Sequence, residues 1–337
     1  MRFAANRDRL VRSCAETGRL NATGHDVLRR VTARHQHTSE ALDAYVAEYP
    51  DVAARPLHGA VVITGLPRTG TTLLHNLLAL DPSFRALRVW EGLSPLPDGD
   101  RVARAQRWLD AFYALVPEFR TIHPATATGP EECDVLLQNA FASQHFDDMF
   151  DAREYSAWLA TAPLTEEYEH YAMQLRVLSS PAGDPWLLKS PGHLGHLDAL
   201  LTVLPDCSVI LCHRDPREAV ASWASLIHTL RGAYSDTADA EAVGAEALAR
   251  ATTATARAQQ ARTSSFVDVD YRRLVAAPVG AVHELYEHLG RPLDPAVAKA
   301  IDEWVDAHPA GRHDYDLARF GLTADAVDAA FAPYRLS

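Results

Sequence analysis

Eight consecutive residues, Gly65 to Thr72, have the types and spacing of an anion-binding loop. They read GLPRTGTT between a short apolar run and a stretch of strong helix formers. The spacing matches the phosphate-binding pattern G-x-x-x-x-G-K-[ST], except that Thr71 stands where the lysine would be. In such a loop the glycines let successive backbone N–H groups converge on an anion, and the helix N-terminus adds partial positive charge. The segment therefore predicts an anion site.

The absence of the lysine indicates which kind of anion this loop would bind. That ammonium bridges the β- and γ-phosphates in nucleoside triphosphatases, whereas this loop instead carries Arg68, a planar fork of donors. The pattern favours one terminal anionic group over a triphosphate. A glycine-containing turn without a ligand is the alternative, and the hydroxyls of Thr71 and Thr72 together with Arg68 argue against it.

Two more cations follow short apolar runs later in the chain. Lys189 ends WLLK and is one of only two lysines, with Lys299, against thirty arginines. A charge in so apolar a strand must pair with an anion or shift its pKa, unless the side chain reaches out to water. Arg214 follows the run VILCH, and Ser222 lies two turns into the next helix, so both side chains can reach one phosphate. Salt bridges from Arg214 to its acidic neighbours are the alternative.

The elements that must position these residues alternate along the chain. Residues 60–64, 186–189, 207–213 and 266–271 read as short buried strands, and helical patterns separate them. This alternation predicts an α/β fold with a parallel sheet covered by helices on both faces. We expect an N-terminal helical extension over 1–58 and an α/β domain over 59–337. That domain would contain a helical and loop insertion at about 92–180, with loops at 92–130 and 228–240.

Composition sets further limits. The 337 residues are 47% hydrophobic and 23% charged, which is typical of a folded globular chain. A formal net charge of -12 disfavours long-range attraction to nucleic acid or an anionic membrane, so an anion needs a local basic cluster. The four cysteines form no C-x-x-C pair and no long apolar span is present, so we expect a cytoplasmic protein without disulfides.

The three motifs GLPRTGTT, LLKSP at 187–191 and VILCHRDPREAVAS at 209–222 together resemble the sulfotransferases that use 3′-phosphoadenosine 5′-phosphosulfate (PAPS). The bacterial branch and the tyrosylprotein sulfotransferases are the most similar, and the resemblance covers most of residues 60–290. It implies a P-loop-like nucleotide-binding fold and a reaction that moves a sulfuryl group to a hydroxyl or amine. The donor would be PAPS, the product 3′,5′-ADP, and no metal is expected.

The resemblance also implies roles for individual residues, which fall into two groups. Lys189 would donate to the oxygen that bridges phosphate and sulfate, with Arg68 assisting catalysis. Tyr271 would lie near the nucleotide, and a closing segment at 308–322 offers Arg312. The remaining implied contacts are to the 5′-phosphosulfate, from Arg68, Thr69, Gly70, Thr71 and Thr72, and to the 3′-phosphate, from Arg214 and Ser222.

A general base for the acceptor is left open among several residues. Glu91 falls near the place where the tyrosylprotein branch carries its catalytic glutamate, and ranks first. Glu132 ranks second, although it and Glu131 also suit the first turn of a helix, where the macrodipole favours carboxylates. A histidine serves in the cytosolic small-molecule branch, for which His123 or His75 would stand in.

Two other function classes compete with sulfuryl transfer. A P-loop nucleotide kinase or triphosphatase would need the loop lysine and a metal-holding aspartate at a strand end, and a nucleotide-binding module would bind without turnover. The expected partner is a small-molecule acceptor, not nucleic acid or membrane. The sequence is compatible with a homodimer but determines neither oligomeric state nor acceptor.

Overall fold

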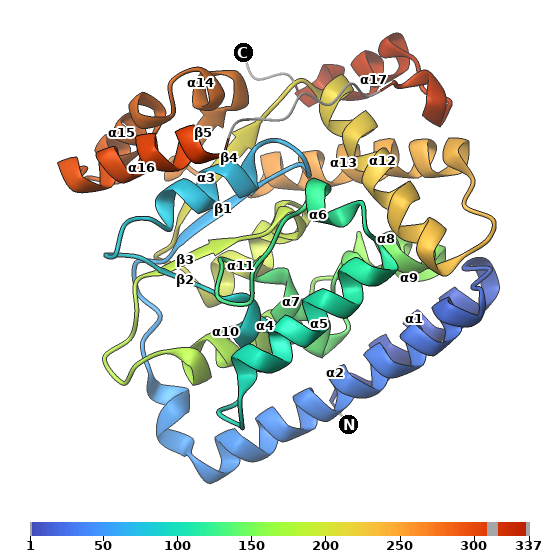
Figure 1. Cartoon of the computed structure of the whole chain (residues 1–337), viewed down its shortest axis with the longest axis horizontal. Coiled ribbons are helices and arrows are strands. Elements are labelled where there is room, and N and C mark those ends of the chain that lie inside the picture. Colours follow the sequence, from blue (N-terminus) through green and yellow to red (C-terminus); the bar gives the residue numbers. More distant parts are fainter. Residues whose placement is uncertain (1, 309–315, 335–337) are drawn as a thin grey trace.

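The computed structural model describes residues 2–308 and 316–334, so Arg312 lies outside the described residues. Five parallel strands form one sheet in the order β2-β3-β1-β4-β5 (Figure 1). The strands are β1 (Val61–Gly65), β2 (Arg85–Ala86), β3 (Trp186–Lys189), β4 (Ser208–His213) and β5 (Phe266–Asp270).

Helices fill the connections between strands and both ends of the chain. The α-helices before β3 are α1 (Ala4–Thr17), α2 (Ala22–Glu48), α3 (Thr71–Leu78), α4 (Val89–Leu93), α5 (Arg101–Leu115), α6 (Phe119–Ile122), α7 (Asp134–Leu137), α8 (His145–Phe150), α9 (Arg153–Leu159) and α10 (Thr165–Leu178). Those after β3 are α11 (Leu197–Val203), α12 (Pro216–Tyr234), α13 (Ala240–Ala261), α14 (Tyr271–Ala276), α15 (Pro278–His288), α16 (Pro295–Ala307) and α17 (Ala324–Phe331). Short 3-10 helices are η1 (Pro50–Ala54), η2 (Gln138–Ala140), η3 (Pro191–His196), η4 (Ala318–Phe320) and η5 (Ala332–Tyr334).

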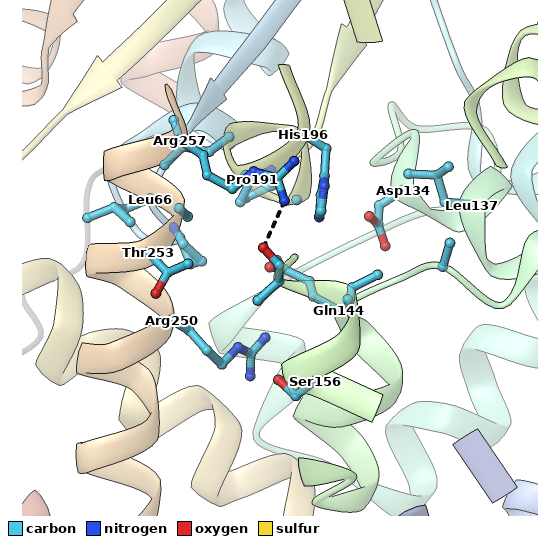
Figure 2. A pocket seen from close by; sticks show the side chains of 18 of the residues that line it. Leu66, Asp134, Leu137, Gln144, Ser156, Pro191, His196, Arg250, Thr253 and Arg257 are labelled. Carbon is cyan, nitrogen blue, oxygen red and sulfur yellow. Dashed lines mark hydrogen bonds between the residues drawn. The ribbon is translucent and has the colours of Figure 1, made fainter. Parts of the chain in front are cut away.

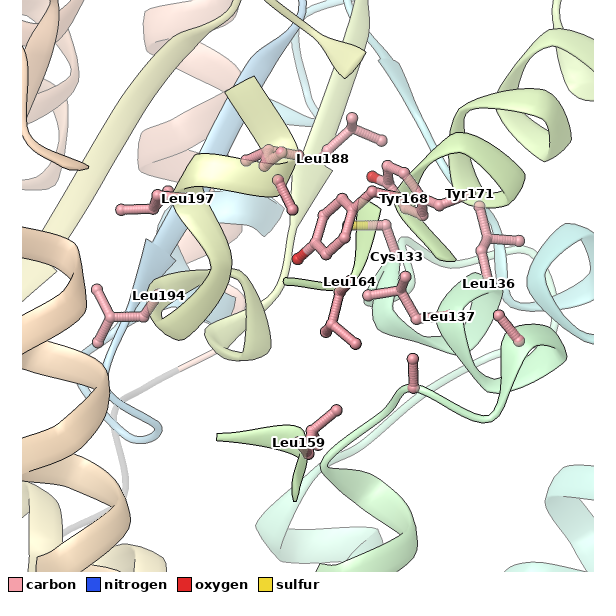
Figure 3. Close-up of a cluster of buried hydrophobic side chains, with 14 of the residues drawn as sticks. Cys133, Leu136, Leu137, Leu159, Leu164, Tyr168, Tyr171, Leu188, Leu194 and Leu197 are labelled. Atoms are coloured by element: carbon pink, nitrogen blue, oxygen red, sulfur yellow. The ribbon is translucent and has the colours of Figure 1, made fainter. Parts of the chain in front are cut away.

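The sheet separates two apolar cores, which explains why its strands are continuously hydrophobic. Successive side chains of a strand point to opposite faces. Val62 and Leu188 accordingly belong to one core, and Ile63 and Leu187 belong to the other. Figure 3 shows part of the first core, where Leu188 lies near the aromatic rings of α10. This two-faced burial confirms the α/β fold expected from the sequence.

The strand register brings the predicted cations to one edge of the sheet. Lys189 aligns with Ile63, and Gly65 aligns with Cys212, one residue before the end of β4. In a parallel sheet all strands end at the same edge, where ligands bind in open α/β folds. The loop after β1 and the residues after β3 and β4 are therefore neighbours.

The expectation of loops at 92–130 and 228–240 was wrong in part. α5 occupies the first interval, because Asp100 caps its N-terminus by accepting from Ala103 N, and buried Ala105, Leu109 and Tyr113 recur every fourth residue. α12 continues to Tyr234 and fills the start of the second interval. Small polar and proline-flanked segments obscured both helices.

The N-terminal helices are built into the main core. Leu10 and Leu28 are buried in the same core as β1 and β3, and α2 packs against η2 and α12. The division of the chain at residue 58 stays a prediction. Among the described residues, no helix has both the length and the apolar composition that a membrane crossing requires.

Candidate active site

The loop between β1 and α3 has the backbone geometry of an anion cradle. Gly70 adopts a left-handed conformation, with φ of 92°, and a Cβ at this position would lie 2.6 Å from the Tyr271 ring. Only glycine fits both requirements. In the described part of the chain, the N–H groups of residues 70–73 make no hydrogen bond, because they precede the first carbonyl acceptors of α3. These donors are available to an anion.

Arg68 connects the loop to α12. Its Nε donates to Ser222 Oγ over 3.0 Å, and its Nη1 donates to the carbonyl of Ile122 over 3.3 Å. Arg68 Cα itself lies at φ of 70°, a conformation that costs energy for a residue with a side chain. The loop is thus held in one shape by contacts to segments distant in sequence.

Arg214 reaches the same loop from the end of β4. Its Nη1 donates to the Arg68 carbonyl over 3.1 Å, and its guanidinium lies 4.4 Å from the centre of the Tyr271 ring. The i, i+4 salt bridge to Glu218 that the sequence offered as an alternative is present, at 2.7 Å. Arg214 therefore contacts the Arg68 carbonyl and Glu218 at the same time.

Lys189 is the cation buried most deeply at this edge, with 1% of its surface exposed. Its Nζ donates to Thr72 Oγ1 over 3.2 Å and forms a salt bridge with Glu132. Thr64 lies on the neighbouring strand β1. Its hydroxyl donates to the carbonyl of Ser190 over 2.8 Å, and this bond fixes the backbone just after Lys189. The ammonium therefore joins the loop after β1 to a carboxylate.

Glu132 stays ionised because two cations flank it. Burial raises the pKa of this carboxyl, but Lys189 and His145 outweigh burial and hold the pKa well below its ordinary value. His145 Nε2 lies 3.5 Å from Glu132, and His145 Nδ1 lies 3.6 Å from Asp134. Burial lowers the pKa of His145, yet those two carboxylates together raise it to about 10. At neutral pH His145 is therefore an imidazolium that lies between the carboxyl groups of Glu132 and Asp134.

Two further titratable groups face this centre. Burial raises the pKa of Glu131 to about 7, and its Oε1 accepts from the backbone N–H of Glu132 over 2.7 Å. Burial lowers the pKa of His123 to about 4, and the positive charge of Lys189 adds to this effect. His123 is therefore neutral at physiological pH and able to accept a proton.

Glu91 does not line the cavity described below. One of its carboxylate oxygens accepts from Arg85 Nη2 over 2.6 Å, and the other accepts from the Arg88 backbone N–H over 2.9 Å, which caps α4. His75 is also buried away from that cavity, and its Nε2 has no partner in the described residues. The predicted catalytic role of Glu91 stays a prediction, but both of its oxygens already have structural partners.

One cavity of about 1040 Å³ collects most of these groups. Its polar end contains Arg68, Gly70, Thr71, Thr72, Glu131, Glu132, His123, His145, Arg214 and Tyr271. The Lys189 ammonium contacts Thr72 and Glu132, which line that end. Thr69 and Ser222 lie beneath the surface, where the Thr69 hydroxyl donates to Leu66 and Ser222 accepts from Arg68. The rest of the lining includes apolar side chains of α5 and α12, among them Leu109, Phe112, Leu226 and Leu230.

A second cavity, of about 70 Å³, lies behind Asp134 (Figure 2). Arg250 and Arg257 reach it from α13, opposite Asp134 and His196. Two buried nitrogens in its wall, His196 Nδ1 and Arg250 Nη2, lack hydrogen-bond partners among the described residues. A cavity of this size has room for ordered water, which would bond to these two nitrogens.

His145 and the apolar wall are the parts of the site that sequence reasoning missed. His145 is one of sixteen histidines, and no local motif surrounds it. A usable signal was present only in the acidic pair at 131–132, whose charge requires nearby cations when buried. No cluster of three or more His, Cys, Asp or Glu side chains arranged to hold a metal occurs within residues 2–308 and 316–334.

Comparison with known proteins gives a match over the segment that contains these motifs. Residues 60–295 match the model described as "Sulfotransferase family". The chain belongs to the sulfotransferase family. Its fold, a P-loop-like parallel sheet flanked by helices, is shared with two crystal structures of bacterial sulfotransferases.

These are STF9 from Mycobacterium avium and STF1 from Mycobacterium tuberculosis H37Rv. STF9 is 28% identical, with a TM-score of 0.81 over 96% of this chain and 88% of that one. STF1 is 26% identical, also with a TM-score of 0.81, over 98% of this chain and 92% of that one. A search of curated proteins finds no match to this sulfotransferase.

Proposed function

We propose that this sulfotransferase moves a sulfuryl group from PAPS to a hydroxyl group of a small-molecule acceptor. The observation that carries the proposal is the Lys189 ammonium, which bridges the loop residue Thr72 and the carboxylate of Glu132. Donor binding and proton abstraction need opposite charges, and here a buried ammonium contacts a carboxylate that lines the cavity. An amine acceptor would use the same groups.

The donor-binding residues fit a 5′-phosphosulfate and a 3′-phosphate. The free N–H groups at the start of α3, with Arg68, Thr71 and Thr72, would bind the 5′ end. Arg214 would bind the 3′-phosphate, with Tyr271 under its guanidinium. Ser222 holds Arg68, and its predicted contact with the phosphate would follow a change of that hydrogen bond.

Bound PAPS supplies an electrophilic sulfur atom with a good leaving group. Glu132 would accept the proton of the acceptor hydroxyl as its oxygen bonds to sulfur. The bond from sulfur to the bridging oxygen breaks, and its electron pair leaves with 3′,5′-ADP. Lys189 would donate a hydrogen bond to that oxygen, where negative charge develops. The proton on Glu132 then passes to solvent.

Glu132 is the base that the geometry supports best. It lines the cavity and contacts Lys189, whereas Glu91 is engaged by Arg85 and Arg88. His123 is the second candidate because it lines the same cavity in its neutral form. Sulfate monoesters carry less charge than phosphates, so this chemistry does not call for a magnesium clamp.

The location that we propose is the cytoplasm. The four cysteines are buried free thiols, which a reducing compartment preserves.

The decisive experiment combines the purified enzyme with PAPS and a diverse library of hydroxyl compounds, and searches by mass spectrometry for a gain of one SO₃. A thermal-shift assay should show stabilisation by 3′,5′-ADP without magnesium, because the ligand binds only the folded state. Stabilisation by Mg²⁺ and ATP, but not by 3′,5′-ADP, would instead support the nucleotide kinase alternative.

A further inference from the structure

One face of α2 forms a wall of the large cavity. Thr23, Val27, Arg30, Val31 and Arg34 recur at helical spacing along it, and all five line the cavity. Two of them are arginines one turn apart. The N-terminal helices therefore contribute charged groups to the same space as the catalytic centre.

Arg34 is a cation of the cavity wall that no acidic side chain of the described residues balances. Arg30 pairs with Asp26, Lys189 pairs with Glu132, and no acidic side chain lies within salt-bridge distance of Arg34 among the described residues. Asp148, another carboxylate that lines the cavity, forms a salt bridge of 2.8 Å with Arg250. A partly buried charge without a partner is costly and is expected to serve a ligand.

Neutral groups hold the Arg34 guanidinium in place. Its Nη2 lies 3.0 Å from His35 Nε2, and since a guanidinium only donates, His35 Nε2 accepts. The proton of His35 is then on Nδ1, which donates to Asn139 Oδ1 over 2.8 Å. Burial lowers the pKa of His35 to about 3 and that of Arg34 to about 10, so at neutral pH only Arg34 carries charge. The contact orients the guanidinium without neutralising it.

Arg34 lines the same cavity as the donor loop but belongs to a different element, α2. Figure 1 shows α2 along the lower edge of the molecule and α3 above it, with α5 between them in this view. The link to the reaction centre runs through η2, where Gln138 contacts His145 over 3.2 Å and the adjacent Asn139 contacts His35. An acceptor with its hydroxyl at Glu132 would extend past η2 toward Arg34.

We propose that the acceptor of this sulfotransferase is an elongated apolar hydroxy acid whose carboxylate binds Arg34. The inference deepens the proposed function and rests on it. A planar guanidinium matches a carboxylate through two parallel hydrogen bonds. One unpaired positive charge also matches a monoanion better than the nearly doubly charged phosphate monoester. The apolar side chains of α5 and α12 would enclose the body of such a molecule.

The test uses ω-hydroxy fatty acids, from octanoic to hexadecanoic chain length, and the methyl ester of each. Calorimetric titration into the full-length enzyme saturated with 3′,5′-ADP measures binding without requiring turnover. We expect at least one acid to bind about tenfold or more tightly than its ester, the scale of a charge-assisted hydrogen bond. Arg34→Gln should remove this preference, and Arg34→Lys should restore part of it. The control Arg29→Gln changes an exposed arginine of the same helix, with 78% of its side chain exposed, and should keep the preference.

Three results would overturn the inference: equal binding of every acid and its ester, a preference that survives Arg34→Gln, or no binding of any acid. The first and third are read on the unmodified protein, so misfolding of a variant does not affect them. The proposed function has a separate readout in sulfate transfer to other hydroxyl compounds. Transfer without an acid preference would reject only the role of Arg34, whereas an acid preference without any transfer would reject the reaction.

Discussion

The two ends of the large cavity are built in different ways. The proposed donor end consists of residues in the loop after β1, in the first turn of α3 and after β4, and contacts such as Arg68 with Ser222 hold them in place. The acceptor end consists of side chains on α2, α5, α8 and α12, which meet only when those helices pack. Under the proposed function, the chemistry would depend on the sheet, whereas the choice of acceptor would depend on helix packing.

The largest effect should come from the residue between the two ends. Glu132→Gln keeps the shape of the side chain but removes its ability to accept a proton, so turnover should fall by about 10²–10⁴. Steady-state kinetics with saturating PAPS measures the change. Glu91→Gln is the matched control, and we expect it to reduce thermal stability through the lost Arg85 pairing while turnover stays near that of the unmodified enzyme. The opposite pattern would return Glu91 to the first rank.

Lys189→Ala should lower turnover by about 10²–10³, the usual cost of removing one preorganised transition-state donor. The chain offers a matched control in Lys299→Ala, since that lysine is exposed on α16 and pairs with Glu303. Both variants are compared in single-turnover measurements, which separate chemistry from product release. A wild-type rate for Lys189→Ala would show that the Lys189 ammonium takes no part in the reaction.

Arg214→Ala should act mainly at the donor end. We expect 3′,5′-ADP to bind about 10- to 100-fold more weakly, because hydrogen bonds to a charged group are lost, with a smaller effect on acceptor binding. Calorimetry on the variant and on Arg217→Ala gives the comparison. Arg217 lies in the first turn of α12, three residues after Arg214, but pairs with Asp328 outside the cavity. Equal losses of 3′,5′-ADP affinity in both variants would show that the effect comes from the change in net charge and not from a contact of Arg214.

Phe112→Ala should act at the acceptor end alone. Phe112 stacks on Trp108 with ring centres 5.4 Å apart and lines the cavity. Removing the ring should raise the KM of an apolar acceptor by about tenfold, and donor affinity should be unchanged. Val102→Ala, an exposed apolar residue of the same helix, serves as the control. A changed donor affinity in Phe112→Ala would show that the two ends are not independent.

The smallest effect concerns stability and pH. The pKa of His145 is raised to about 10 because the opposing effect of burial is exceeded by the attraction of Asp134 and Glu132. Its protonation therefore stabilises the folded state fully below pH 6.5, and this contribution is lost as the pH rises through 10. Melting temperature should fall over that range, and His145→Gln should flatten the curve. An identical slope in the variant would assign the loss to other groups.

The features that the sequence predicted belong mainly to the sheet and its loops, and the features that it missed belong mainly to the packed helices. Residues 65–72 and Lys189 were predictable because local spacing and an apolar strand constrain them directly. The placement of His145 beside Glu132 was not, since it depends on how α8 packs against the segment before α7. The helical character of 101–115 was hidden because its apolar residues are spread among arginines and alanines. Long-range packing, rather than propensity, decides these features.

The scarcity of lysine in this chain offers a spectroscopic handle. Isotope labelling of lysine alone introduces only two side-chain signals, one from the solvated amine at position 299 and one from the enclosed amine at position 189. The first is an internal reference that lies outside the cavity. The second reports occupancy of the reaction centre at a single atom, so donor and acceptor titrations can be followed by nuclear magnetic resonance without attaching any probe.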